Sequence, residues 1–158
     1  AGRRSAYTPE MIVNGETDIV GTKPMLLSEA IAAHKETGVR MALDAQREGG
    51  SLRITGTVPT GAVGPMDVHV LRVTPARTTK ITRGENKSKT LTYTNIAHDW
   101  RVVGTWDGQS PLDLSVEISG EEPVVVLVQQ AGPGAIVAAA NPAAASGGVP
   151  KTTARDRL

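Results

Sequence analysis

The densest run of charged side chains lies between positions 72 and 89, and it is the first candidate for chemistry. It combines six cationic residues with one acidic residue: Arg72, Arg77, Lys80, Arg83, Lys87, Lys89 and Glu85. Its centre, RGENKSK, is typical of a hairpin loop, because Gly84 and Asn86 tolerate unusual backbone angles. Arg83 and the neighbouring Lys87 suit the capture of an anion or polyanion. The simpler interpretation, which we favour, is a solvated hairpin whose charges prevent edge-to-edge pairing.

Three of the four aromatic residues form a second candidate group, consisting of Tyr93, Trp100 and Trp106. Trp106 precedes the turn signal Asp107-Gly108, and its simplest role is to pack across a β-sheet core, because large rings carry much buried area. An exposed ligand platform that uses Tyr93 and Trp106 is the alternative. The basic loop contains no aromatic residue that could stack on bases, so we expect no nucleic-acid partner.

The other reactive residue types form no catalytic or metal-binding pattern. His34, His69 and His98 lack the spacing that would bring three or four ligands to a zinc ion. No serine stands in a Gly-x-Ser-x-Gly context. The chain contains no cysteine, so it has no thiolate for catalysis and no disulfide. We therefore expect no metal, no cofactor and no dithiol chemistry from this chain alone, and we favour a role other than catalysis.

The composition points to a compact domain without an overall charge preference. The net charge is +1, too balanced to imply nucleic acid or a membrane surface as a partner of the whole chain. Hydrophobic residues make up 39% of the chain, and the absence of Phe favours β-strands rich in Val, Ile and Leu. No apolar run approaches the ~20 residues of a membrane-spanning helix.

The first 38 residues predict a strand, a hairpin, a second strand and a helix. Met11 to Val13 and Asp18 to Val20 are β-prone, and Asn14-Gly15 between them is a strong hairpin signal. Thr22 can cap a helix with Pro24 in its first turn. Leu27, Ala30, Ile31 and His34 then recur at helical spacing, so we expect a helix from Pro24 to Thr37 ending at Gly38.

From Val39 onward, apolar residues alternate with polar ones and predict an antiparallel β-sandwich of seven or eight short strands. The candidate strands are Val39 to Gln46, Leu52 to Val58, Val68 to Arg72, Leu91 to Thr94, Arg101 to Thr105, Leu112 to Ile118, Val124 to Gln130 and Ile136 to Ala140. Residues 95–99 fit either a helical turn or a bulged strand. After residue 142 small residues, Gly and Pro dominate, which predicts a flexible tail over 143–158.

Two blocks of sequence resemble a known family. They are YTPEMIVNG near the start and ITRGENKSKTLTYTNIAHDWRVVGTWDG from Ile81 to Gly108. Together they resemble the C-terminal part of an uncharacterised family of secreted bacterial proteins with a thioredoxin-like core. The resemblance implies an α+β fold, with the second half of a thioredoxin-like domain over 1–38 and a β-sandwich over 39–142. It also places a cis proline at Pro9, after Thr8, opposite a Cys-x-x-C pair that this chain lacks.

The function expected from these observations is binding or assembly rather than catalysis. By resemblance the protein is periplasmic or secreted, and it needs a protein partner or its own N-terminal fragment to complete the sheet. The strand after Pro9 should otherwise leave an open edge, which a second polypeptide or an oligomer partner would pair with. The alternative is a thiol-disulfide redox protein whose Cys-x-x-C lies on a separate or omitted fragment. Candidate binding residues are Thr8, Pro9, Arg83, Glu85, Asn86, Lys87, Tyr93 and Trp106.

Overall fold

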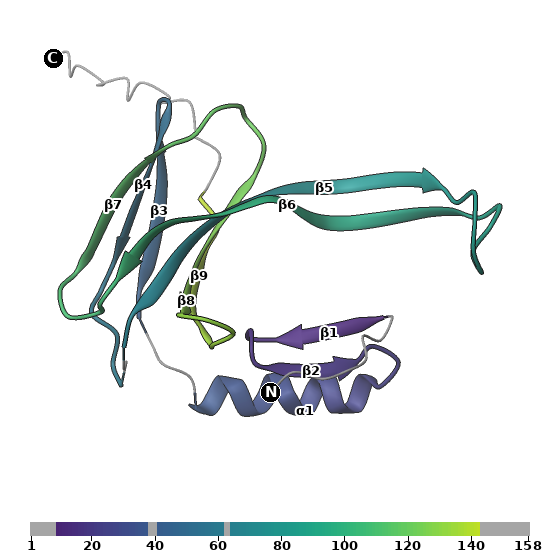
Figure 1. Cartoon of the computed structure of the whole chain (residues 1–158), viewed down its shortest axis with the longest axis horizontal. Helices are drawn as coiled ribbons and strands as arrows, with labels where there is room; N and C mark the ends of the chain where they lie inside the picture. The colour runs from purple at the N-terminus through teal and green to yellow at the C-terminus, as the bar shows by residue number, and fades with distance from the viewer. Residues whose placement is uncertain (1–8, 38–40, 62–63, 143–158) are drawn as a thin grey trace, which may run out of the picture.

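A computed structural model describes residues 9–37, 41–61 and 64–142 of the chain. The described residues form one helix and nine strands in three antiparallel sheets (Figure 1). This arrangement agrees with the expected α+β class and with antiparallel pairing. The Thr8–Pro9 peptide bond and the 143–158 tail lie outside the described residues, so the predictions made for them stay predictions.

The N-terminal unit is a hairpin covered by one helix. Strands β1 (Glu10–Val13) and β2 (Thr17–Val20) pair antiparallel, and helix α1 (Pro24–Thr37) follows. Asn14 and Gly15 both adopt positive φ, of 54° and 79°. The Asn-Gly turn is therefore confirmed, because those two residue types accept positive φ at low cost.

Helix α1 uses a narrow stripe to contact the hairpin. Leu27, Ala30 and His34 are the half-buried residues of the helix, at the spacing of one helical face. His34 Nε2 lies 2.9 Å from Thr17 Oγ1, and Ile19 of β2 is 8% exposed. Ile31, which we expected on the same stripe, is 41% exposed. The helix bounds agree with the prediction, but the packed stripe is narrower than expected.

The rest of the described chain forms two sheets packed face to face. The three-stranded sheet has the order β3-β4-β7 and the four-stranded sheet the order β6-β5-β8-β9. Their strands are β3 (Leu43–Glu48), β4 (Ser51–Gly56), β5 (Met66–Lys80), β6 (Thr90–Trp106), β7 (Leu112–Glu117), β8 (Val124–Gln130) and β9 (Ile136–Ala140). The core lies between the sheets, where Leu52, Ile54, Val126 and Val128 are fully buried. Burial of this aliphatic area is the main stabilising term of the sandwich.

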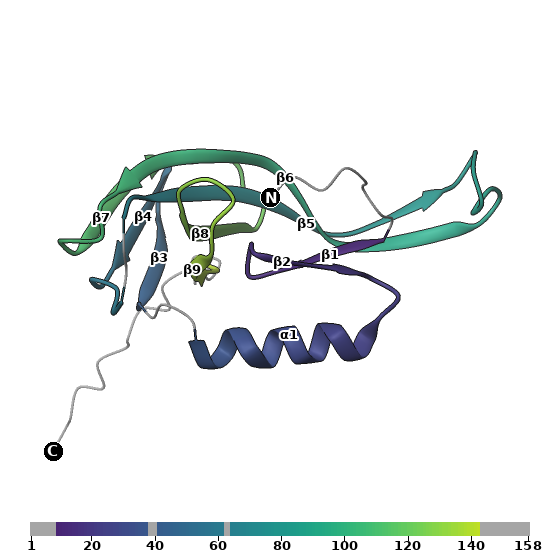
Figure 2. The ribbon, with the colours of Figure 1, turned by 60° about the horizontal axis from the view of Figure 1, so that its bottom comes forward.

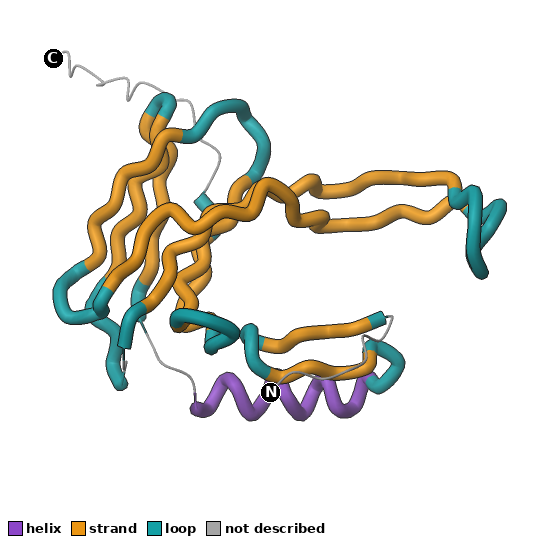
Figure 3. Tube along the Cα trace, viewed as in Figure 1, coloured by secondary structure: helices purple, strands orange, loops and turns teal. Residues whose placement is uncertain are grey.

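Strands β5 and β6 are much longer than the sequence pattern suggested. They have 15 and 17 residues, and their outer halves leave the sandwich as a two-stranded ribbon (Figure 3). We call residues 74–97 the arm. Leu91 to Thr94 and Arg101 to Thr105, expected as separate strands, belong to the single strand β6. Residues 95–99 are the bulged alternative, since Asn95 and Asp99 have positive φ within that strand.

The N-terminal unit touches the sandwich through the tip of its hairpin. Ile136 N–H, at the start of β9, donates to Asn14 O over 2.9 Å. Gly15 packs so closely against the β8–β9 turn that a Cβ there would lie 2.7 Å from Gly134 O. From this point the unit extends below the arm, and Figure 2 shows the same relation after rotation. The arm, the four-stranded sheet and the unit therefore border one common side of the molecule.

Candidate functional site

The side of the molecule bordered by β1, the base of the arm and the arm itself carries four exposed large apolar side chains. They are Ile12 on β1 and Tyr93, Trp100 and Val102 on β6, with exposures of 63%, 47%, 55% and 54%. We call this set the open face. Soluble proteins seldom expose several large apolar side chains in one region unless something binds there.

The backbone of β1 contributes a hydrogen-bonding edge to the open face that no other described strand occupies. In the described residues β1 pairs with β2 alone, and Figure 1 shows β1 on the arm side of the pair. Gly21 N–H donates to Pro9 O over 2.8 Å, so Pro9 and Gly21 form a hydrogen-bonded pair of the antiparallel ladder. Hydrogen-bonded and non-hydrogen-bonded pairs alternate along such a ladder, so the pairs that contain Glu10 and Ile12 are non-hydrogen-bonded. The backbone groups of Glu10 and Ile12 consequently point away from β2. An extended polypeptide could pair with them without disturbing the existing hairpin.

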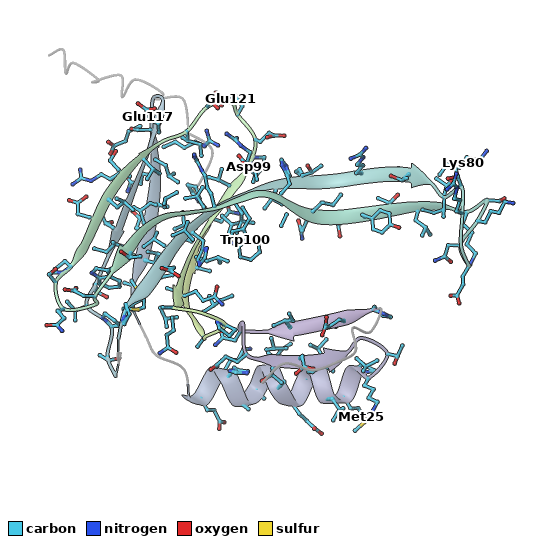
Figure 4. The ribbon with its side chains drawn as sticks, viewed as in Figure 1. Met25, Lys80, Asp99, Trp100, Glu117 and Glu121 are labelled. Carbon is cyan, nitrogen blue, oxygen red and sulfur yellow. The ribbon has the colours of Figure 1, made fainter. Side chains whose placement is uncertain are left out.

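The outer surface of the four-stranded sheet supplies the apolar platform of the open face. Trp100 Nε1–H donates to His69 Nδ1 over 3.0 Å, and the two rings meet edge to face. Val102 and Leu127 both pair directly with His69, so all three share that surface. Figure 4 shows Trp100 beneath the base of the arm, toward β1. The accepted hydrogen bond requires the proton of His69 to reside on Nε2.

The arm has two chemically different surfaces. Arg77 and Tyr93 are directly paired and share the ribbon surface that continues from His69. The opposite surface is rich in hydroxyls, with Thr78 and Thr92 joined by a 2.9 Å hydrogen bond. Arm residues are mostly exposed on both surfaces, and a two-stranded ribbon without cover is only marginally stable in water.

The structure places the predicted site residues in three separate regions. Thr8 is outside the described residues, and Pro9 is exposed next to β1. Arg83, Glu85, Asn86 and Lys87 lie together in the exposed loop at the tip of the arm, as the hairpin interpretation expected. Tyr93 belongs to the open face. Trp106 is 7% exposed and donates from Nε1 to Ser110 O, so it packs into the sandwich core with little of its ring left exposed.

A polar depression lies where the base of the arm meets the β7–β8 connection. It has a volume of about 780 Å³ and is lined partly by Arg72, Asp99, Arg101 and Glu117. Arg72 is already satisfied: Nε donates to Asp99 over 3.1 Å, Nη2 to Ser119 O over 2.6 Å, and Nη1 lies 3.7 Å from Glu122. These contacts tie the base of the arm to the β7–β8 connection. We assign this cluster a structural role.

Among the described residues, the surface pair of Arg53 and Asp113 shows a clear electrostatic effect. The hydrogen bond and charge of Asp113 raise the pKa of Arg53, which keeps that exposed guanidinium charged. No group of three or more His, Asp or Glu side chains in the described ranges could hold a metal ion. The described residues also contain no helix long and apolar enough to cross a bilayer.

Sequence reasoning grouped Trp100 with the other aromatic residues without selecting it as a binding residue, and it missed the role of Val102 and the neighbouring His69. An alternating signal was present, because Trp100 and Val102 flank Arg101, whose guanidinium donates to Glu117 O on the opposite surface. Alternation along a strand indicates that its side chains point to two faces of the sheet, but it does not say which face is covered. Only the position of the N-terminal unit identifies the face of the four-stranded sheet that stays exposed.

Comparison with known proteins provides a family but no activity. Residues 1–129 match the family model described as a protein of unknown function, DUF1223, and the chain therefore belongs to this family. A crystal structure of a protein from Agrobacterium tumefaciens superposes with a TM-score of 0.71 at 26% identity. The match covers 88% of this chain and 63% of that one, so the chain spans less than two thirds of its relative. No curated protein matches.

Proposed function

We propose that this DUF1223 protein is a non-enzymatic binding or assembly module that accepts an extended polypeptide segment on its open face. The observation that carries the proposal is the free edge of β1. It presents the outward backbone groups of Glu10 and Ile12 beside exposed apolar side chains. A strand added to this edge would satisfy those groups, and its side chains would meet Trp100 and Val102.

The length of the relative suggests where such a segment comes from. The Agrobacterium tumefaciens protein has more than a third of its chain outside the match. A segment of this kind, on the same chain or on a separate one, is the occupant we propose. It would turn the two-stranded β1–β2 sheet into a larger sheet. The thioredoxin-like nature of the completed unit and a periplasmic or secreted location remain part of the proposal.

The redox alternative makes a different demand on the occupant. This chain contains no cysteine, so both thiols of a dithiol pair would have to arrive with the bound segment. The β1 edge would then hold the segment in place, and the chain itself would contribute no reacting atom. Binding is therefore the activity common to both proposals, and it is the one to test first.

The test uses the part of the Agrobacterium tumefaciens protein outside the match, produced as a separate polypeptide. Hydrogen exchange of the amides of residues 10–13 is measured with and without it. We expect the amides of Glu10 and Ile12 to become protected on mixing, because only these point away from β2. Unchanged exchange at both amides, at concentrations where the added polypeptide is soluble, would refute the proposal.

A matched pair of variants separates edge pairing from side-chain contact. Ile12→Pro removes the outward N–H while leaving the β1–β2 ladder bonds, whereas Ile12→Thr keeps the N–H and removes apolar surface. One lost backbone hydrogen bond of about 1.4 kcal/mol corresponds to roughly tenfold weaker binding for Ile12→Pro. Ile12→Thr should bind with a smaller loss. Equal losses for both variants would contradict strand addition.

A further inference from the structure

The arm concentrates unpaired positive charge at one end of the molecule. Positions 74–97 contain five cationic residues and one acidic residue, a net charge of +4, while the whole chain is +1 and the remainder is therefore −3. The N-terminal unit over 9–36 has five acidic and two cationic residues, a net charge of −3. Figure 1 shows the tip of the arm at one end of the long axis, farther out along this axis than any part of the acidic unit formed by β1, β2 and α1.

Four of the five arm cations differ from the described arginines of the sandwich in having no side-chain partner among the described residues. Every described arginine outside the arm donates to an acceptor: Arg47 to Gly120 O and Glu122 O, Arg53 to Asp113, Arg72 to Asp99 and Ser119, and Arg101 to Glu117 O. Within the described residues the side chains of Arg77, Lys80, Arg83 and Lys87 have no hydrogen bond or ion pair. Their charge is thus available to a partner.

The loop that carries these cations is held in one shape by its own backbone. Ser88 N–H donates to Ile81 O over 2.8 Å, Ile81 N–H to Lys89 O over 2.9 Å, and Lys87 N–H to Gly84 O over 3.0 Å. Lys89 Nζ also donates to Asn86 Oδ1 over 3.1 Å. Gly84 and Ser88 adopt positive φ to close the turn. A preorganised loop loses little conformational entropy when it binds.

We propose that this basic tip, defined by Lys80, Arg83, Lys87 and Lys89, docks on the anionic headgroups of a lipid bilayer. The tip is convex and projects from the body, which suits contact with an extended anionic surface. None of its large apolar side chains is among the strongly exposed ones, and Ile81 is half-buried, so the contact is electrostatic and without insertion. The acidic N-terminal unit is repelled by the same surface, which orients the molecule with its arm forward.

Other anionic partners fit these observations less well. Single-stranded nucleic acid needs aromatic platforms among the cations, and the loop over 81–89 has none. A specific protein interface needs a dehydrated apolar centre, which a tip made of cations, Thr and Asn does not provide. The proposal concerns a surface separate from the open face and does not depend on the strand-addition function.

The test is co-sedimentation of the full chain with vesicles of phosphatidylcholine alone and of phosphatidylcholine mixed with phosphatidylglycerol. We expect binding only to the anionic vesicles. The affinity should fall steeply between 50 and 300 mM salt, because salt screens the interaction between exposed charges. Arg83→Gln/Lys87→Gln should weaken binding roughly 30-fold, since each cation near an anionic bilayer contributes about a factor of five.

The control variant removes the same charge elsewhere. Lys23→Gln/Arg53→Gln lowers the net charge by the same two units, at positions outside the arm, and should change vesicle binding less than threefold. Equal losses in the two double variants, or no binding to anionic vesicles, would overturn the proposal. Binding to polyphosphate or to single-stranded DNA without binding to vesicles would also overturn it, in favour of a soluble polyanion.

Discussion

Arg72 shows how one side chain can fix a large element. Its side chain is 13% exposed and contacts Asp99 on β6 and both Ser119 and Glu122 in the β7–β8 connection. The guanidinium thus joins the base of the arm to the far sheet. In the sequence it resembled the other cations between 72 and 89, because charge type alone does not reveal which cation is paired. Asp99 and Ser119 lie 27 and 47 residues away from Arg72 in the sequence, so a local sequence pattern cannot predict these contacts.

We predict that Arg72→Ala lowers the free energy of unfolding by about 2 kcal/mol. The variant leaves Ser119 O without its donor and loses two ion pairs, and the partial exposure of both carboxylates keeps the loss below that of a fully buried pair. Arg53→Ala is the matched comparison, because its exposed pair with Asp113 is solvated and should contribute nothing measurable. Urea titration at neutral pH compares the two. Equal losses would show that burial does not distinguish these ion pairs.

Among the elements, the hairpin and helix of the N-terminal unit were predictable because their signals are local. Asn14-Gly15 specifies its turn, and Pro24 begins the helix as expected. The arm was not predictable in length, since β5 and β6 continue through Pro75 and through Asn95 and Asp99, residues that normally end strands. The register shift between Val70 and Arg72 places Asp99 in a bulge, whereas the ladder passes Pro75 and Asn95 without a change of register. Alternation therefore located the strands but not their ends.

A glycine comparison tests whether the N-terminal unit is docked as described. Gly15→Ala adds a Cβ 2.7 Å from Gly134 O and 2.9 Å from Gln129 Nε2, whereas Gly49→Ala meets nothing within 4 Å. Both positions have positive φ, so both variants carry a similar backbone penalty of about 1 kcal/mol. We expect an additional loss for Gly15→Ala, visible as faster hydrogen exchange in β1 and β2. Identical exchange in the two variants would indicate that the hairpin tip does not pack on the β8–β9 turn.

At the scale of the whole molecule, the sandwich core and the two recognition surfaces are physically separate. Buried residues lie between the sheets, while the open face and the basic tip lie on the arm, β1 and the outer sheet surface. The sequence indicated the sandwich because burial imposes alternation on its strands. It did not indicate the open face, which exists only because the N-terminal unit contacts the sandwich at one corner. A surface formed by the relative position of two units leaves no periodic signal in either one.

This separation predicts that the arm can be removed without unfolding the protein. Thr74 and Ile96 are directly paired, so replacing residues 75–95 by Asn-Gly closes a short hairpin at that point. Arm residues contribute almost nothing to the core, since the four buried residues of β5, Met66, Val68, Val70 and Leu71, all lie before the cut. We expect the thermal midpoint to change by no more than about 3 °C, corresponding to about 1 kcal/mol for a chain of this size. Circular dichroism melting measures it.

The same deletion separates the two recognition surfaces. Vesicle binding should disappear with the basic tip, while protection of the Ile12 amide by an added strand should persist, because β1 and Trp100 remain in place. In the intact protein, amides over 74–80 should exchange faster than those of Val68 and Val70, although both groups belong to the continuous strand β5. The reason is that β5 is flanked by β6 and β8 only up to Arg72, and beyond it pairs with β6 alone. Uniform protection along β5 would mean that the arm is stabilised by contacts other than its own ladder.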